Sequence, residues 1–349
     1  MDQRDDGLVA PGSAAGATTT AGGPQGWAGK AGARIAAWPP GLFAGLLAGI
    51  GFVGGLVLFR TRLGGSQEIE TFTSTPQFGI WAALIALQIG LWGALTPGLL
   101  RINLKLRREL GRERGWRGLG WQDGCYLALL VLLVVVLAIL GATGQPVPPA
   151  VSWRIRGVTW LGLVVVGMPI FTGVWLLQET ITRLGVTLVA APREEKTGEV
   201  AWEPTGRTIF ASVVHKRAVL QHLLLAASLI IGAATLATGA LRLTVLAAAP
   251  DAPFPASYPL LYGGFFTIVL AFVYIPAYLS LQQLGNSLVD GCWPVPSTKP
   301  GKDWYEHRQS ASAALGLTVS AKDSFQAGAA ILAPLATSIV TVLLPDNTG

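Results

Sequence analysis

The residue types best suited to metal binding or catalysis are few in this chain, and their spacing is unfavourable. His215 and His222 could both bind a metal ion. Seven residues of helix, however, separate them by about 10.5 Å along the axis, whereas a metal-bound nitrogen lies about 2 Å from the ion. The segment "TKPGKDW" around Lys302 fails at both ends as a phosphate-binding loop. We therefore expect no metal ion, no cofactor and no enzymatic activity.

The clearest pattern of charged residues is a basic stripe after residue 100. Its cations recur every three or four residues, at Arg101, Lys105, Arg108 and Arg112. Aliphatic residues recur beside them with the same period, at Leu99, Ile102, Leu106 and Leu110. This arrangement predicts a helix with one apolar face and one basic face. The basic face could bind anionic lipid headgroups, with about 1 kcal/mol gained per cation, or it could be a solvated face that only marks membrane orientation. Nucleic acid is not an expected partner, because Trp116 and Trp121 are too few for a base-stacking platform.

Two uncharged features could mediate contacts inside a membrane. Gln88 lies near the centre of an apolar block, where its amide could line a polar path or hydrogen-bond a neighbouring helix. Gly41, Gly45 and Gly49 lie four residues apart on one helix face, which lets another backbone approach closely. That glycine face predicts packing within this chain or self-association of two copies.

The elements that position these residues are long apolar blocks. Hydrophobic residues make up 51% of the chain and charged residues only 13%. Six blocks of membrane-spanning length contain no Lys, Arg, Asp or Glu: 41–59, 78–100, 126–142, 158–177, 218–241 and 261–281. A seventh block, 327–344, is richer in alanine and contains Pro334. Because backbone groups in lipid must be hydrogen-bonded internally, we predict an all-α, polytopic helical membrane bundle of six transmembrane helices. The C-terminal block adds a seventh helix that crosses or re-enters.

The distribution of Lys and Arg predicts the orientation. If the N-terminus is cytoplasmic, 20 of the 25 basic residues lie on the cytoplasmic side and five on the other. We therefore expect a multi-pass protein of the cell membrane with a cytoplasmic N-terminus. The composition, rich in Ala, Gly, Arg and Trp, is typical of a bacterial protein.

This orientation divides the chain into four parts. Residues 1–36 have few large apolar side chains and are predicted to be a disordered cytoplasmic tail. Residues 37–281 form the six-helix bundle, with cytoplasmic loops 101–125 and 178–217; the β-branched run "GVTLVAAP" favours a short hairpin in the second loop. Residues 282–326 form a cytoplasmic segment, and 327–344 form the seventh helix.

Two functions fit these patterns. The first is a non-enzymatic scaffold or sensing component, whose basic cytoplasmic loops hold a cytoplasmic protein partner or a second copy of the chain. The alternative is a passive transporter or pore, because the second, fourth and sixth blocks contain Pro97, Pro169 and Pro276, and transporters use broken helices near their binding sites. The lipid bilayer is a partner in both cases.

Overall fold

The computed structural model describes residues 40–61, 66–111, 121–142, 147–190, 204–293, 300–317 and 321–343. The chain divides into two units, Met1–Phe43 and Ala44–Gly349, and nearly all described residues belong to the second. Every regular element among them is a helix. The predicted disordered tail, 1–36, and Arg112 of the basic stripe lie outside the described residues.

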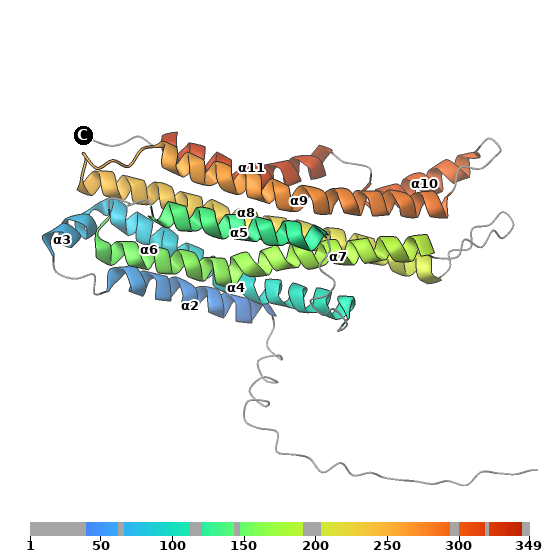
Figure 1. The fold of residues 1–349 in the computed structure, drawn as a ribbon, viewed down its shortest axis with the longest axis horizontal. Helices are drawn as coiled ribbons and strands as arrows, with labels where there is room; N and C mark the ends of the chain where they lie inside the picture. Colours follow the sequence, from blue (N-terminus) through green and yellow to red (C-terminus); the bar gives the residue numbers. More distant parts are fainter. Residues whose placement is uncertain are drawn as a thin grey trace, which may run out of the picture. The chain divides into compact units, whose positions relative to one another are not determined.

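Within the described residues, five helices are long and apolar enough to cross a membrane, and Figure 1 shows how they are arranged. They are α2 (Pro40–Arg60), α4 (Pro76–Leu110), the continuous helix made of α6 (Pro149–Gly162), η2 (Leu163–Gly167) and α7 (Met168–Ala190), then α8 (Pro204–Ala248) and α9 (Ser257–Cys292).

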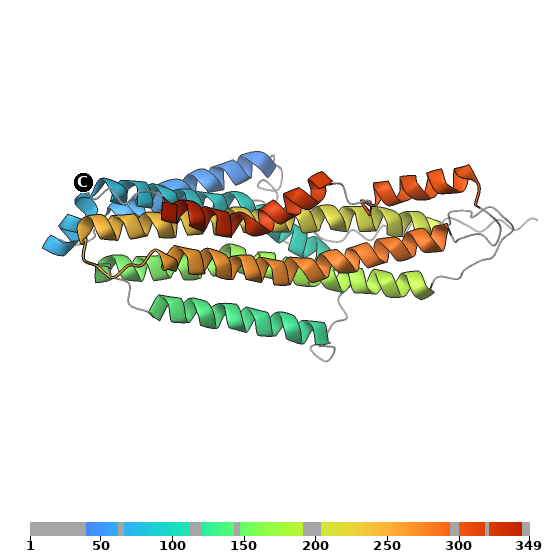
Figure 2. The same cartoon turned by 90° about the horizontal axis from the view of Figure 1, so that it is seen from above.

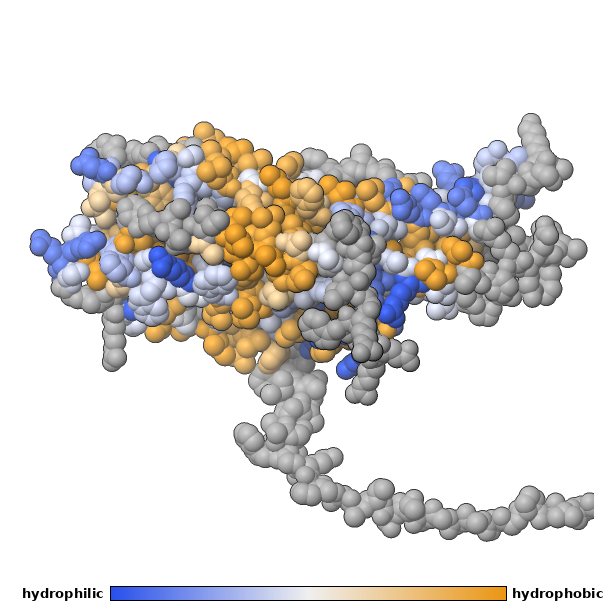
Figure 3. All heavy atoms as spheres, in the orientation of Figure 1, coloured by the Kyte–Doolittle hydropathy of each residue, from blue (hydrophilic) through white to orange (hydrophobic). Residues whose placement is uncertain are grey.

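Large apolar side chains on these helices face outward. Ile80, Leu261 and Phe272 are 61%, 67% and 67% exposed, and many others resemble them. On the face drawn in Figure 3, hydrophobic residues gather over the middle of the molecule and hydrophilic residues lie toward both ends. So much exposed apolar surface is unfavourable in water but suits the interior of a bilayer. The prediction of an integral membrane protein built from helices is confirmed.

The third and seventh apolar blocks also form helices, α5 (Trp121–Ala142) and α11 (Ala321–Leu343). Their described apolar stretches, Tyr126–Val136 and Ala327–Thr341, are shorter than a membrane span. Five candidate membrane-spanning helices are therefore found in the described part of the chain, and a sixth and a seventh transmembrane helix remain predictions.

Four of the long helices continue past their apolar blocks at the same end of the second unit. There α7, α8 and α9 extend beyond the end of α4, and α10 (Lys302–Ala314) lies beside α9 (Figure 2). We call this end the basic end and define it by residues 101–110, 178–190, 204–217, 282–293 and 300–317. The described parts of the predicted loops 101–125 and 178–217 are therefore mostly helical.

The described part of the basic stripe lies on the last turns of α4 and is helical, as predicted. Its apolar face is buried, because Leu99, Leu106 and Leu110 are at most 7% exposed. The first strand of the hairpin predicted within 178–217, from the run "GVTLVAAP", is wrong, because residues 185–190 belong to the last turns of α7. Leu184 and Leu188 pack against the core there, so their helical period outweighs the β-propensity of the intervening residues. The rest of that hairpin, 191–203, lies outside the described residues.

The packing face of α2 differs from the predicted one. The predicted face consists of Gly41, Gly45 and Gly49. These glycines are exposed, and a side-chain carbon added at any of them would meet no described atom within 4 Å. In contrast, α2 packs on α4 through Gly51 and Gly55, where an added carbon would lie 2.8 Å from the Ile89 carbonyl oxygen and 2.8 Å from the Ala86 Cα. At about 100° per residue, Gly49 lies about 160° from Gly51 and about 120° from Gly55 around the helix, so the in-chain contact uses a different face from that of Gly49.

Glycines also let α11 lie close along α8 and α9. A side-chain carbon added at Gly239 on α8 would lie 2.4 Å from the Thr341 Cβ, and one at Gly263 on α9 would lie 2.5 Å from the Pro334 carbonyl oxygen. Such distances leave no room for a methyl group, so α11 packs closely against both α8 and α9.

At the end opposite to the basic end, the short helix α3 (Gln67–Ser74) joins α2 to α4. The Ser66 side chain accepts a hydrogen bond from the Ile69 backbone N–H, and Thr75 accepts one from the Phe78 N–H. These side chains satisfy backbone donors at the first turns of α3 and α4.

Candidate functional site

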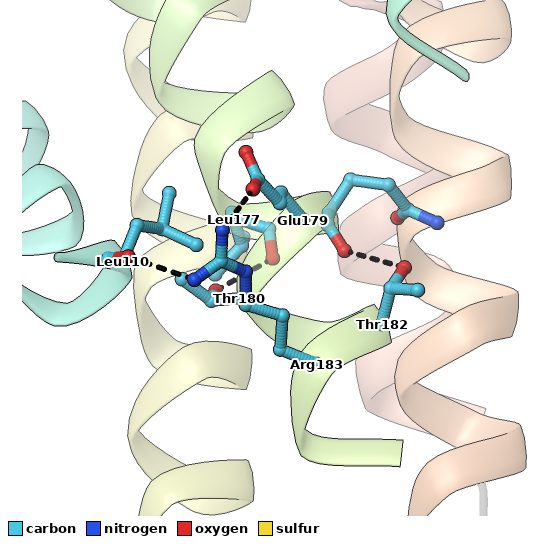
Figure 4. A network of polar contacts seen from close by, with 7 residues as sticks. Leu110, Leu177, Glu179, Thr180, Thr182 and Arg183 are labelled. Carbon is cyan, nitrogen blue, oxygen red and sulfur yellow. Dashed lines mark hydrogen bonds and ion pairs between the residues drawn. The ribbon is translucent and has the colours of Figure 1, made fainter. Parts of the chain in front are cut away.

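The basic end is held together by cationic side chains that bind the ends of neighbouring helices. Figure 4 shows the clearest case, in which Arg183 on α7 reaches the end of α4. Its Nη1 donates to the Leu110 carbonyl oxygen over 2.7 Å, and its Nη2 pairs with Glu179 Oε1 over 3.0 Å. The last carbonyls of a helix have no internal donor and carry partial negative charge, so an arginine there is well placed.

An ion pair with one buried partner, Lys216, joins α8 to α4 nearby. Lys216 Nζ lies 2.7 Å from Glu109 Oε2, and the two side chains are 5% and 35% exposed. A nearly buried ammonium group needs such a partner, because an unpaired charge away from water is strongly unfavourable. The pair fixes the last turns of α4 relative to α8.

Arg217, the next residue on α8, binds the turn after α10. Its Nη1 donates to the carbonyl oxygens of Leu315, over 3.0 Å, and of Gly316. Gly316 has φ +65°, and the Leu317 N–H donates to the Ser312 carbonyl oxygen over 2.8 Å, which is a Schellman turn. Glycine is suited to that left-handed backbone, and Arg217 ties the turn to the bundle.

The surface of the basic end that faces away from these contacts carries basic side chains. Arg101, Lys105 and Arg108 are exposed, so the predicted basic stripe faces the surroundings over its described length. Lys105 Nζ lies 2.8 Å from His215 Nε2 on α8. His215 thus contacts a lysine, and His222, also exposed, lies two turns further along α8. No group of three or more His, Cys, Asp or Glu suited to a metal ion is found in the described part of the chain.

The opposite end uses the same kind of contact. Arg154 on α6 is 8% exposed and donates to the carbonyl oxygens of Leu58 and, over 3.0 Å, of Thr61, at the end of α2. Arg242 on α8 donates from Nε to the Phe254 carbonyl oxygen in the turn before α9. Arginines therefore organise both ends of the bundle, although the sequence reasoning used them only to predict orientation.

A second candidate site lies between the ends, in the apolar part of the bundle. It is a cavity of about 200 Å³ lined by residues of α4, α5, α6, η2, α7, α8 and α9. One wall is a face of α4 whose residues recur every three or four positions: Trp81, Ile85, Gln88 and Trp92. The lining is otherwise almost wholly aliphatic or aromatic, so the cavity suits an apolar occupant.

Gln88 lies in this cavity wall and is 9% exposed. Within the described residues its side chain makes no hydrogen bond, so the predicted bond to a neighbouring helix is not found. Trp92, one turn further along α4, is 3% exposed, and its indole Nε1 has no acceptor among the described residues. Sequence reasoning missed Trp92; its place four residues after Gln88 is the signal that could have identified it.

Two other amides do join helices. Asn103 on α4 donates from Nδ2 to the Pro169 carbonyl oxygen over 2.8 Å, and Thr172 donates to Asn103 Oδ1 over 2.9 Å. Gln178 on α7 donates from Nε2 to Ser280 Oγ on α9 over 2.8 Å. These bonds connect α7 to α4 and to α9 near the basic end.

Comparisons of the chain with protein-family models, with curated proteins and with solved structures find no match. The basic end and the cavity are therefore the features of this chain from which a function can be inferred.

Proposed function

We propose that this chain is a non-enzymatic scaffold or sensing component of the cell membrane. In this proposal its basic end lies on the cytoplasmic side, where it binds anionic lipid headgroups and a cytoplasmic protein partner or a second copy of the chain. The observation that carries the proposal is the combination at the end of α4 of a buried apolar face, exposed cations and fixed neighbours.

Rigidity is the physical reason that this arrangement suits a docking surface. Glu109 and the Leu110 carbonyl are held by Lys216 and Arg183, so the exposed cations project from an ordered helix. Less conformational entropy is lost when a partner binds groups that are already in place. The long inner extensions of α7, α8 and α9 supply further surface beside α4.

Replacement of exposed cations tests the lipid part of the proposal. The Arg101→Gln/Arg108→Gln variant should retain less phosphatidylglycerol, relative to phosphatidylethanolamine, when purified in mild detergent at low salt. Because each cation near a membrane surface contributes about 1 kcal/mol, we expect a loss of roughly tenfold or more. The matched control is Arg60→Gln/Arg156→Gln, which removes two exposed arginines from the opposite end. Equal retention by both variants would contradict headgroup binding.

Cross-linking in intact membranes tests the protein partner. The wild-type chain should be recovered with a second protein or a second copy, and the Arg101→Gln/Arg108→Gln variant should lose that product. Recovery of the wild-type chain alone would contradict a scaffold.

The cavity beside Gln88 favours the alternative, a passive transporter. It lies within the apolar region, and η2, a five-residue π-helical segment, interrupts the regular helix in its wall. A polar solute would meet few polar groups in that lining, whereas an apolar solute fits it. Flux of small solutes into liposomes tests this function: transport should exceed that of empty liposomes and fall in Gln88→Leu.

A further inference from the structure

The cavity in the bundle is long and narrow. Three of its walls are helix faces that run from Trp81 to Trp92 on α4, from Tyr262 to Val273 on α9 and from Ala227 to Leu241 on α8. At about 1.5 Å per residue these faces extend about 16 Å on α4 and α9 and about 21 Å on α8. The volume, about 200 Å³, is only somewhat larger than the apolar cavity of about 150 Å³ that admits benzene in an engineered protein. Spread over such a length, it leaves room for one extended chain and not for a bulky ring system.

The cavity begins near the end of the bundle opposite to the basic end. Trp81 and Tyr262 lie in the second turns of α4 and α9, and Leu241 lies two turns before the end of α8. From there the cavity extends about 16 Å or more toward the middle of the bundle. One leaflet has about this depth, because the hydrocarbon core of a bilayer is about 30 Å thick. The cavity therefore has the length of a single lipid acyl chain.

The walls of the cavity suit hydrocarbon. The described residues that line it include no Lys, Arg, His, Asp or Glu, so an ion would lose its hydration there without compensation. The hydroxyls of Thr159 and Thr238 donate to carbonyl oxygens of their own helices over 2.9 Å. These two hydroxyls therefore require no polar ligand, whereas an alkyl chain can fill the space without any loss of hydrogen bonds.

The cavity is not closed, and it can be reached from the lipid-facing surface. Thr159 on α6 belongs to its wall and is also exposed. Leu161 and Val164, beside it in sequence, are 52% and 63% exposed, as expected for residues in contact with lipid. Inside the cavity, the α8 face carries small side chains at Ala234 and Ala237, which leave the space free.

From these observations we propose that the cavity holds one acyl chain of a glycerophospholipid from the leaflet at the end opposite to the basic end. The chain lies along α4, α8 and α9, with its ester near Trp81 and Tyr262 and its methyl end near Trp92 and Val273. This site is separate from the headgroup contacts proposed for the basic end, because it belongs to the other leaflet. The lipid is then a resident part of the bundle, unlike lipids that exchange freely at the surface.

Photochemical labelling tests the proposal on the full chain in nanodiscs. The probe is phosphatidylcholine with a diazirine in the middle of one acyl chain, which on illumination loses N₂ and inserts into nearby C–H bonds. Ile85 on α4 lines the cavity and is 7% exposed, whereas Leu87 on the same helix is 47% exposed. Mass spectrometry of the digested chain should find adducts at both residues. Adducts at Leu87 and none at Ile85 would overturn the proposal.

A filled cavity supplies the control. Ala234→Phe should place a ring in the cavity and remove the Ile85 adduct, with the Leu87 adduct unchanged. The matched variant is Leu229→Phe, at a position 51% exposed on the same helix, and it should keep both adducts. If Ala234→Phe does not fold, Ala237→Leu makes a smaller change to the same wall. An Ile85 adduct that persists in the folded variant would show that the chain does not occupy the cavity.

Gln88→Leu separates an acyl-chain site from a polar transport path. The Gln88 side chain lines the cavity and makes no hydrogen bond within the described residues, so leucine in its place suits an alkyl chain at least as well. The Ile85 adduct should therefore be unchanged or stronger in this variant, whereas flux through a transporter should fall. Loss of the Ile85 adduct in Gln88→Leu would show that the occupant needs a polar contact, which contradicts an acyl chain.

Discussion

Ser228 on α8 donates a hydrogen bond to the carbonyl oxygen of Ala330 on α11 over 2.6 Å, and shares that proton with the Leu224 carbonyl oxygen of its own helix, 2.8 Å away. In a regular helix that carbonyl would accept from the N–H of residue 334, but Pro334 has no N–H. The hydroxyl of a neighbouring helix therefore replaces the donor that the proline removes. This bond, together with the close approach at Gly239 and Gly263, explains how a helix with an internal proline packs along the bundle.

Removal of that hydroxyl should destabilise the bundle by a modest amount. In Ser228→Ala the Ala330 carbonyl loses its donor, and we expect a cost of about 0.5–1.5 kcal/mol, as for other hydrogen bonds between membrane helices. Thermal unfolding in detergent micelles measures it. Pro334→Ala restores the helical N–H, so the cost of Ser228→Ala should largely vanish in that background. The same cost in both backgrounds would show that Ser228 does not act on the freed carbonyl.

The ion pair between Lys216 and Glu109 should respond asymmetrically to substitution. Glu109→Gln leaves a nearly buried ammonium group unpaired and should cost roughly 3 kcal/mol, whereas Lys216→Met leaves a carboxylate that still reaches water and should cost less. The double variant should recover most of the loss in unfolding temperature. If the two single variants are equally unstable, the burial of Lys216 is not the reason for the pairing.

Two neighbouring glycines of α2 should behave in opposite ways. Gly51→Ala places a methyl group 2.8 Å from the Ile89 carbonyl oxygen and should cost about 1–3 kcal/mol through displacement of α2 from α4. Gly49→Ala meets no described atom and should be neutral or slightly stabilising, because alanine favours a helix by up to about 1 kcal/mol over glycine. Unfolding measurements on the two variants decide between the faces. Loss of a dimer in Gly49→Ala, with the monomer intact, would assign that face to self-association.

The apolar blocks predicted the helices well because membrane length and lack of charge are properties of a segment by itself. The face that a helix buries depends on its neighbours, so the spacing of Gly45 and Gly49 could not identify the contact at Gly51. The hairpin was predicted from β-branched residues, although the helical period of Leu184 and Leu188 was present in the same segment. The cavity could not be predicted, because residues from seven helical segments line it.

The orientation of the basic end is the central claim and can be measured directly. The chain has two cysteines, Cys125 and Cys292, which can be replaced by serine. Arg107→Cys at the basic end and Arg156→Cys at the opposite end, both at exposed positions, can then be labelled with a membrane-impermeant maleimide on intact cells. We predict that Arg156→Cys is labelled from outside and that Arg107→Cys is labelled only after the cells are permeabilised. Labelling of Arg107→Cys on intact cells, or release of the chain from membranes without detergent, would contradict the account.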